Sequence, residues 1–325
     1  MTLKSMNTKP ILIITGEPFS IFSEIFFKTI KNYKFKKKIV LIGSLKLLKK
    51  QNKFLGFNNV FNQINSDFNF SDLKKNAINV INVELKTTKT FAKISKKSKN
   101  FIKICFDIAL NLLLKKKVSG VINGPISKVN FLSKNIFGVT EYFAKLTDVN
   151  NYAMLIYNKD LSVSPITTHI PINNVSKSLK KKNIINQTLL IKKFFKNYFN
   201  KDAKIAITGL NPHCESRLKN NEELIIIKPA IKYLKKVCKY IDGPLSADSL
   251  FMKKNIKKYD VVIGMYHDQV LTPFKSLYNF NAINITLGLP FIRISPDHGT
   301  NEHMAGKNIS NPESLYHAIN FFDKR

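Results

Sequence analysis

The stretch ILIITGEPFSIFSEIFFKTIKNYKFKKKIVLIG, residues 11–43, decides the fold class of this chain. It contains two short apolar runs, ILIIT at 11–15 and KIVLIG at 38–43, and a helical pattern follows each of them. The same alternation of strand-like and helix-like segments continues to the C-terminus. This pattern predicts an α/β protein with a largely parallel sheet.

Outward from this stretch, further strands are expected at 118–123, 152–157, 204–208, 260–265 and 282–287. Helices are expected at 98–116, 182–198, 223–240 and after Pro312, where Asn311 can cap the first turn. A chain of 325 residues with 44% hydrophobic content usually forms more than one core, so we expect two lobes.

The chain shows no sign of a membrane or secreted protein. No apolar run approaches the roughly 20 residues that span a bilayer, and the N-terminus lacks a signal-peptide cleavage site. The three cysteines, Cys105, Cys214 and Cys238, are widely spaced and odd in number, which argues against a disulfide framework. We therefore expect a cytoplasmic protein, with Cys105 and Cys238 as packing residues.

The formal net charge of +32 invites a nucleic-acid-binding interpretation. However, almost all of the positive charge is lysine spread along the whole chain, and the arginines are only Arg217, Arg293 and Arg325. Readers of bases and phosphates favour arginine for its bidentate fork. We interpret the lysines as a bias of composition that also steers anionic substrates, and we expect no nucleic-acid partner.

Three histidines occupy equivalent places along the chain. His169 ends VSPITTH, His213 ends KIAITGLNPH and His267 ends DVVIGMYH, each at or shortly after a strand-like run. Ligands of open α/β sheets bind outside the carboxyl ends of the strands, and imidazole is a leading ligand of Zn²⁺ and Co²⁺. The histidines either form one metal site or act as separate capping or core residues. Asp268 either orients a ligand or acts as a general base.

The segment NITLGLPFIRISPDHGTNEHMAG, residues 284–306, is the second dense stretch of polar and small residues. Arg293 in an arginine-poor chain suggests an anion clamp, with a surface ion pair as the alternative. His298, Gly299 and Thr300 form a polar turn, and Ala305 with Gly306 leaves space for a flat ring. No GxGxxG occurs, so a nicotinamide cofactor would not use the Rossmann phosphate loop.

Two further positions remain open from the residues alone. Thr140 in TEYFAKLT either contacts a substrate or caps a helix, and Lys275, eight residues after His267, is either functional or a surface charge.

Together, these segments resemble the 4-hydroxythreonine-4-phosphate dehydrogenase family. The resemblance covers nearly the whole chain, and MYHDQ at 265–269 with NITLGLPFIR at 284–293 is its most specific part. Its other segments are ITGEP, NGPISK, TEYFAKLT, TTHIP, GLNPH, GPLSADSLF and DHGT. The resemblance implies an isocitrate/isopropylmalate dehydrogenase-like fold: two α/β lobes around a central cleft, in a homodimer with the active site at the interface. We expect residues 1–125 with 282–325 in the first lobe and 126–281 in the second.

The resemblance also implies roles for individual residues. His169, His213 and His267 match metal ligands for one divalent ion (Zn, Mg, Co or Mn), and Asp268 and Lys275 are the expected catalytic residues. The expected substrate-binding residues are Thr140, Lys275, Asn284 and Arg293. The expected contacts of NAD or NADP are His298, Gly299, Thr300, Ala305 and Gly306.

Three segments depart from the family pattern. GEPFSIFSE, within 16–24, lacks the usual glycines, which predicts a stiffer or reshaped loop. A shorter, charged segment at 214–223 replaces a glycine-rich one. Val139 stands where the family has a substrate-contacting histidine. These departures affect the substrate more than the reaction class.

The implied reaction is the NAD-dependent oxidative decarboxylation of 4-phosphooxy-L-threonine to 3-amino-2-oxopropyl phosphate, in pyridoxal 5'-phosphate (vitamin B6) biosynthesis. The alternative within the class is a dehydrogenase of a sugar-acid phosphate such as threonate or erythronate phosphate. Outside the class, the alternatives are a lysine-rich nucleic-acid-binding protein and an inactive paralogue that binds ligand without turnover.

Overall fold

The computed structural model describes residues 9–132, 138–214, 220–279 and 281–324. The chain forms two compact units, Met1–Phe143 with Pro290–Arg325 as unit 1 and Ala144–Leu289 as unit 2. These boundaries differ from the expected ones, which followed residues 125 and 281. Phe131 and Phe143 stay with unit 1 because their rings lie 5.7 and 5.3 Å from that of Phe106. The strand at 283–287 stays with unit 2 because it pairs there with the strand at 153–157.

Unit 1 contributes six strands in its described residues, and all neighbouring pairs among them are parallel. Their order is β3 (Phe61–Ile64), β4 (Ile78–Asn82), β2 (Ile39–Gly43), β1 (Ile11–Ile14), β5 (Val121–Asn123) and β12 (Arg293–Pro296). All four residues of β1 are buried, as expected for the central strand of a sheet that is covered on both faces.

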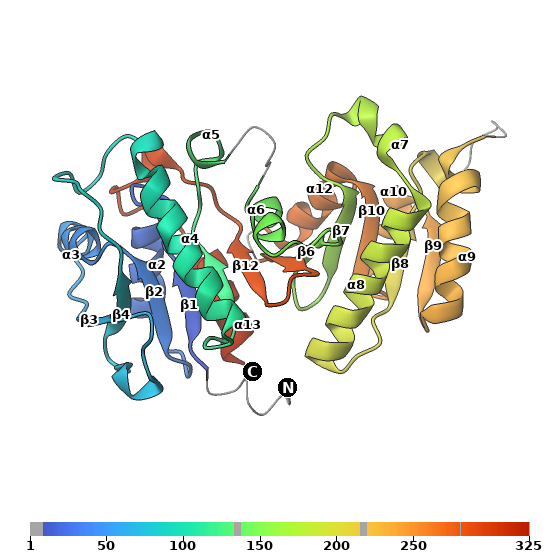
Figure 1. The fold of residues 1–325 in the computed structure, drawn as a ribbon. Coiled ribbons are helices and arrows are strands. Elements are labelled where there is room, and N and C mark those ends of the chain that lie inside the picture. The colour runs from blue at the N-terminus through green and yellow to red at the C-terminus, as the bar shows by residue number, and fades with distance from the viewer. Residues whose placement is uncertain (1–8, 133–137, 215–219, 280, 325) are drawn as a thin grey trace. The chain divides into compact units, whose positions relative to one another are not determined.

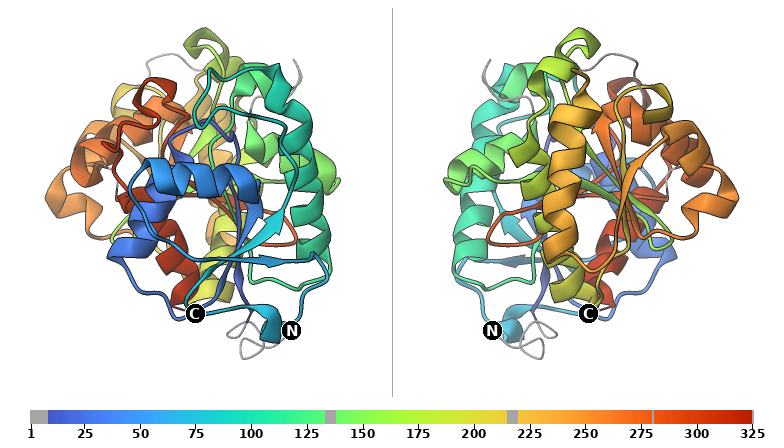
Figure 2. Two further views of the ribbon diagram at one scale, coloured as in Figure 1. Left: turned by 90° about the vertical axis from the view of Figure 1, so that its left-hand side faces the viewer. Right: turned by 90° about the vertical axis from the view of Figure 1, so that its right-hand side faces the viewer.

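Helices cover both faces of this sheet. Figures 1 and 2 show α4 (Lys99–Leu114) on one face and α2 (Phe22–Asn32) with α13 (Glu313–Asp323) on the other. The Asn311 side chain accepts a hydrogen bond of 2.8 Å from Glu313 N, so it caps α13 as the sequence predicts. The remaining helical elements are α3 (Leu45–Phe54), α5 (Lys128–Phe131), α6 (Val139–Leu146), which runs into unit 2, and the 3₁₀ turns Phe70–Asp72, Lys96–Ser98 and Glu302–Met304.

Unit 2 contains a mixed sheet. Its order is β11 (Ile283–Leu287), β6 (Ala153–Tyr157), β7 (Ser162–Thr167), β10 (Val261–Tyr266), β8 (Ile205–Thr208) and β9 (Ile241–Leu245). The four strands from β7 to β9 are parallel, whereas β6 is antiparallel to both of its neighbours. The carboxyl ends of β7, β10 and β8 therefore lie side by side.

In Figure 1, α8 (Lys181–Phe199) lies in front of the unit 2 sheet and α12 (His267–Tyr278) behind it. Val270 and Phe274 of α12 are fully buried and share a core cluster with Val262 of β10. The other helical elements are α7 (Val175–Ser178), α9 (Lys228–Val237), α10 (Ala247–Leu250), α11 (Lys253–Ile256), the 3₁₀ turns Ile172–Asn174 and Pro212–Cys214, and a π-helical turn at Glu223–Ile227.

Every strand and helix expected from the sequence is present, although the segment expected as one helix at 223–240 begins with the π-helical turn. The buried positions of Cys105 and Cys238 confirm them as packing residues. Across the described residues, no helix is both long and apolar enough to cross a membrane.

Candidate active site

Unit 2 places the three histidines at one edge of its sheet. His267 directly follows β10 and is the first residue of α12, while His169 lies two residues after β7. His213 lies in the turn Pro212–Cys214 that follows β8. Since β10 lies between β7 and β8 and is parallel to both, the predicted placement at the strand ends is confirmed.

The structure brings two of the three rings together. The ring centroids of His169 and His267 are 6.3 Å apart. His213 has a left-handed backbone conformation, with φ of 58°. Among the residues that the structure describes, no three His, Cys, Asp or Glu side chains are close enough to hold a metal ion. The convergence of all three histidines therefore stays a prediction.

Asp268 contacts the imidazole of its neighbour in the sequence. Its Oδ1 lies 2.6 Å from Nδ1 of His267, so Nε2 is the ring nitrogen left for another partner. A carboxylate in this position orients the ring and makes it a more basic ligand. Of the two roles open for Asp268, this geometry favours the orienting one.

A buried carboxylate holds the loop that carries His213. Glu223 is 1% exposed, and its Oε1 accepts hydrogen bonds from the backbone N–H of Leu210 (2.7 Å) and Asn211 (2.8 Å). The Asn211 side-chain amide donates to both Glu223 and Glu222. Burial raises the pKa of Glu223, but the hydrogen bonds from Asn211 and Leu210 outweigh burial and lower it overall.

These two glutamates end the charged segment 214–223, of which residues 215–219 lie outside the described part of the chain. Sequence reasoning recorded the segment only as a departure from the family pattern. In the sequence, the supporting role is indicated only by two consecutive glutamates shortly after the loop that follows a strand. The structure shows that Glu222 and Glu223 support the His213 loop.

Asp248 of α10 lies near the same loop. Its pKa is lowered mainly by hydrogen bonds from Ser246 and the Ser249 N–H, and the positive potential of His213 adds to the effect. Asp248 is thus electrostatically linked to His213.

Asn284 and Lys275 also belong to unit 2 but lie on different elements. Asn284 is on β11, and its Oδ1 is buried with no hydrogen-bond partner among the described residues. Lys275 is exposed in the last turn of α12. At a rise of 1.5 Å per residue, it lies about 12 Å along that helix from His267. The structure therefore does not bring Lys275 to the histidine edge of its own unit.

In unit 1, Arg293 forms a buried polar cluster with residues far away in the sequence. It is 2% exposed on β12; its Nε donates to Asn123 Oδ1 (2.7 Å) and its Nη1 to Thr140 Oγ1 (3.1 Å). The alternative of a surface ion pair is therefore wrong. Thr140 lies inside the first turn of α6, which begins at Val139, so its alternative role as a helix cap is wrong too.

The charge of Arg293 is buried beside one carboxylate. Burial lowers the pKa of its guanidinium, and the nearby Glu141 opposes this by favouring the charged form. Glu141 Oε2 is itself buried without a hydrogen-bond partner in the described residues. Buried polar atoms are nearly always paired in folded proteins, so this cluster has spare capacity for a polar ligand.

The expected cofactor segment also lies in unit 1. The Nδ1–H of His298 donates to Gly299 O (3.3 Å), while its Nε2 is buried with no partner among the described residues. Burial lowers the pKa of His298, which favours the neutral ring. A Cβ added at Gly299 would meet only Asn301 Oδ1, at 3.5 Å, so the space beside this residue is open.

Gly306 has a different environment from the one expected. A Cβ at Gly306 would lie 2.9 Å from the ring of Phe91, and the φ of Gly306 is +79°. The flat ring that approaches Gly306 thus belongs to the protein itself. Local packing requires a glycine at this position. The space beside Gly306 is filled by Phe91, whereas the space beside Gly299 is open.

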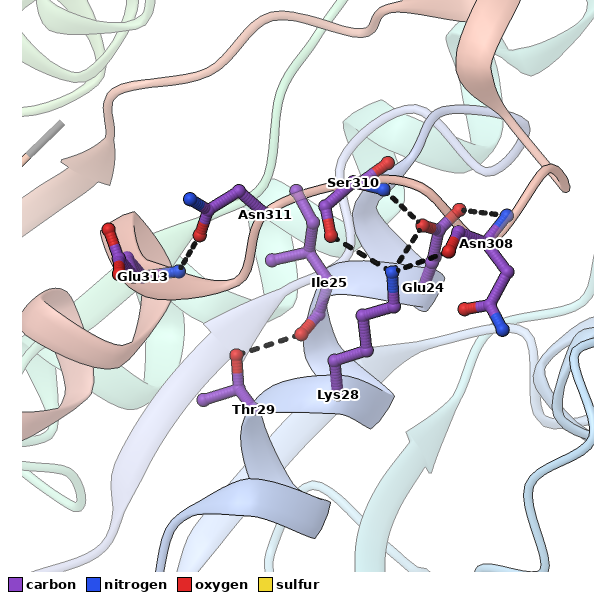
Figure 3. A network of polar contacts seen from close by, with 8 residues as sticks. All are labelled: Glu24, Ile25, Lys28, Thr29, Asn308, Ser310, Asn311 and Glu313. Atoms are coloured by element: carbon purple, nitrogen blue, oxygen red, sulfur yellow. Dashed lines mark hydrogen bonds and ion pairs between the residues drawn. The ribbon is translucent and has the colours of Figure 1, made fainter.

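Both ends of the cofactor segment are anchored to α2 and the loop before it. The Ile21 N–H donates to Thr300 O (3.2 Å). After Gly306, the buried Glu24 accepts hydrogen bonds from the backbone N–H of Asn308 (3.2 Å) and Ser310, and Lys28 donates to the backbone oxygens of the same two residues (Figure 3). The altered 16–24 segment therefore supports residues 297–310.

Glu17 is a titratable residue of this region that sequence reasoning did not single out. It is 1% exposed, and burial raises its pKa to about 7, while contacts with Ser98 and Phe19 oppose the rise and Glu302 adds to it. Asn123, the partner of Arg293, was also missed. In the sequence, Asn123 is marked only as a polar residue at the end of a predicted strand.

Comparison with known proteins identifies the family of this chain. A family model described as pyridoxal phosphate biosynthetic protein PdxA matches residues 35–322. The 4-hydroxythreonine-4-phosphate dehydrogenase of Sulfurihydrogenibium sp. (strain YO3AOP1) is 39% identical over 313 residues, which cover 94% of this chain and 95% of that protein. A protein of Oceanobacillus iheyensis named "Putative D-threonate 4-phosphate dehydrogenase" is 30% identical, with 97% of each chain covered.

A solved structure shows the same relationship. The crystal structure of 4-hydroxythreonine-4-phosphate dehydrogenase from Klebsiella pneumoniae has a TM-score of 0.83 and 28% identity, covering 97% of this chain and 98% of that one. The fold is thus the α/β fold related to the isocitrate/isopropylmalate dehydrogenases. Because the family model and these relatives match nearly the whole chain, this protein belongs to the PdxA family of pyridoxal phosphate biosynthetic proteins.

Proposed function

We propose that this protein is an NAD(P)- and divalent-metal-dependent dehydrogenase that oxidises 4-phosphooxy-L-threonine at C3. The resulting β-keto acid loses CO₂ and leaves 3-amino-2-oxopropyl phosphate. The observation that carries the proposal is the placement of His169, His213 and His267 at the ends of three adjacent parallel strands, with two of the rings 6.3 Å apart.

These histidines suit a divalent metal ion in number and chemistry. Three imidazoles leave coordination positions open for a substrate, and Zn²⁺ and Co²⁺ bind imidazole well. When bound there, the ion acts as a Lewis acid that polarises an oxygen of the substrate. The protein contributes the orientation of the ligands, through Asp268 at His267 and through Glu223 at the His213 loop.

Arg293, Thr140 and Asn284 are the proposed substrate-binding residues, with Lys275. Arg293 is held at two nitrogens by Asn123 and Thr140, so its orientation is set before a ligand arrives. A charge-assisted hydrogen bond from such a preoriented group contributes about 1.5–3 kcal/mol. The unpartnered Oδ1 of Asn284 is suited to accept a hydrogen bond from a hydroxyl or amino group.

The cofactor is proposed to lie along residues 298–306. The open space at Gly299 and the unpartnered Nε2 of the neutral His298 support this, and Thr300 is fixed through its backbone oxygen. NAD⁺ supplies the hydride acceptor, while the protein positions it. Ala305 and Gly306 stay in the proposed cofactor segment, although Phe91 packs against Gly306.

We also propose a homodimer, and the position of Lys275 supports it. Because Lys275 lies about 12 Å along α12 from His267, we propose that it serves the active site of the partner subunit. The active site would then lie at the subunit interface. The first residue of α12, His267, would serve one active site, and Lys275 in its last turn would serve the other.

The direct test is formation of NADH from 4-phosphooxy-L-threonine, combined with metal analysis of His169→Ala, His213→Ala and His267→Ala. Each variant is expected to lose most of its metal and activity. His317→Ala on α13 is the matched control and should retain both. Stoichiometric metal in all three variants would place the site elsewhere, and a wild-type protein that binds ligands without forming NADH would be an inactive paralogue.

A second substrate class is supported by Val139, which replaces a histidine of the family pattern, and by the similarity to the Oceanobacillus iheyensis relative. The candidate is a sugar-acid phosphate such as D-threonate 4-phosphate. Val139→His separates the two. We expect kcat/KM on 4-phosphooxy-L-threonine to stay nearly unchanged or to rise tenfold to a hundredfold, about 1.5–3 kcal/mol. A large loss on this compound, or a wild-type preference for the threonate ester, would support the second class.

A further inference from the structure

A large pocket of unit 1 is lined by none of the candidate active-site residues. It has a volume of about 770 Å³, within the range of roughly 300–1,000 Å³ typical of small-molecule sites. Its lining comes from the segments just before β2, β3 and β4 and from α2. It therefore lies at the amino ends of three neighbouring parallel strands. Glu17, Asn123 and the cofactor segment instead lie at or just after the carboxyl ends of β1, β5 and β12.

The lining is far more basic than the chain as a whole. Six of its 17 residues are lysines and none is acidic, compared with 53 Lys and Arg among all 325 residues. The lysines come from two segments: Lys34, Lys36, Lys37, Lys38, Lys74 and Lys75. The fold therefore brings two lysine-containing segments, about 40 residues apart in the sequence, to one concavity.

Two of these lysines are already engaged. Lys38 donates to the backbone oxygens of Phe70 (3.1 Å) and Leu73 (2.7 Å) and lies 4.0 Å from the Phe70 ring centroid. Lys37 also has an interaction partner. In the described ranges, by contrast, no ion pair joins a carboxylate to Lys34, Lys36, Lys74 or Lys75, all of which are exposed.

One carboxylate next to this segment is engaged by backbone groups. Asp323 accepts hydrogen bonds from the backbone N–H of Lys36 (3.0 Å) and Lys37 (2.7 Å), so it is used in joining α13 to this segment. Several ammonium groups around a concave, low-dielectric wall repel one another and raise the local positive potential. A bound polyanion relieves this repulsion.

The floor of the pocket is apolar. Phe26, Ile30, Ile39 and Ile78 contribute to it, and the amides of Asn59 and Asn76 lie among the polar lining. Lysines act as flexible point charges that suit phosphate groups, and an apolar floor suits a flat organic ring.

We propose that this pocket binds a small phosphate ester with several negative charges and a flat apolar part, of the nucleoside di- or triphosphate class. The concave shape favours such a ligand over an RNA strand, which would need a continuous basic groove. The site is separate from the proposed active site and would bind its ligand whether or not the protein is catalytically active.

Lys74 and Lys75 are the residues to change. The backbone of Lys74 is held through its N–H and C=O by the side chain of Asn79 (2.8 and 3.0 Å), so glutamine at these two positions should preserve the loop. A matched control is K253Q with K254Q on α11 of unit 2. That pair is also consecutive and exposed, and its replacement removes the same two charges.

The test is calorimetric titration of the full chain with ATP, inorganic tripolyphosphate and adenosine at constant ionic strength. We expect ATP to bind more tightly than tripolyphosphate, and adenosine not to bind measurably. K74Q/K75Q should weaken ATP binding at least tenfold, about 1.4 kcal/mol, and K253Q/K254Q less than twofold.

Four results would overturn the proposal: equal weakening in both double variants, no ATP binding by the wild type, displacement of ATP by saturating NAD⁺, or binding of a poly(U) strand without binding of ATP. Tripolyphosphate that binds as tightly as ATP would refute the role of the apolar floor.

Discussion

At the scale of single residues, Arg293 combines a permanent charge, near-complete burial and two fixed hydrogen bonds. Arg293→Lys keeps the charge but cannot contact Asn123 and Thr140 in the same fork geometry. The KM for the anionic substrate should rise roughly tenfold, about 1.4 kcal/mol, while the KM for NAD⁺ changes little. Steady-state kinetics with each substrate varied in turn measures both constants. A raised KM for NAD⁺ alone would reassign Arg293 to the cofactor.

Glu17 should influence stability in a pH-dependent way. Since burial raises its pKa from 4.5 to about 7, the folded state is penalised once Glu17 ionises. The contribution to stability is present below the unfolded-state pKa and is lost as the pH rises through about 7. The shift corresponds to a loss of about 3 kcal/mol at alkaline pH.

Glu17→Gln removes this ionisation. The variant should be more stable than the wild type by up to about 3 kcal/mol near pH 8, and nearly equal to it near pH 4. Urea unfolding of both proteins at the two pH values measures the difference. A difference that is the same at both pH values would show that Glu17 stays ionised, or stays neutral, throughout.

At the scale of elements, one carboxylate supports a whole loop. Glu223→Gln places an amide N–H among the N–H donors of Leu210 and Asn211, so at least one buried hydrogen bond is lost, at about 1–3 kcal/mol. The melting temperature of the metal-free protein should fall, and affinity for Zn²⁺ should drop tenfold to a hundredfold as His213 is displaced.

Glu222→Gln is the matched control for this prediction. From this loop, Glu222 accepts a hydrogen bond only from the Asn211 side chain, and its other oxygen accepts one from Ser176. Thermal unfolding without metal and calorimetric titration with Zn²⁺ give the two readouts. Equal effects of the two substitutions would mean that Glu223 has no special part in holding the loop.

At the scale of the whole molecule, a shared active site predicts complementation between inactive subunits. Lys275→Ala and His267→Ala should each abolish most activity. In a mixed dimer, one active site would carry both substitutions and the other neither. Random pairing makes half of the dimers mixed, so co-expression should restore about a quarter of wild-type activity. Mixed dimers isolated with two different affinity tags, but without activity, would show that both residues act within one subunit.

The sequence alone determined the α/β class and most elements, because apolar periodicity and helix capping are local properties of the chain. It also placed the three histidines at strand ends, since a strand and the loop that follows it are neighbours in the sequence. Strands β3 (FNQI), β4 (INVIN), β9 (IDGPL) and β12 (RISP) were not anticipated, because Asn, Ser, Gly and Pro interrupt their apolar pattern. Neighbouring strands supply the hydrogen bonds that stabilise them.

Only the tertiary structure decided which side chains work together. Arg293 is hydrogen-bonded to Asn123, which lies 170 positions away in the sequence, and Glu24 to Ser310, which lies 286 positions away. The pocket lined by six lysines is formed by segments about 40 residues apart. The tertiary structure also assigned Gly306 to packing against Phe91 and Glu223 to the His213 loop. Burial, pKa shifts and hydrogen-bond partners depend on contacts between distant segments, and such contacts exist only once the chain has folded.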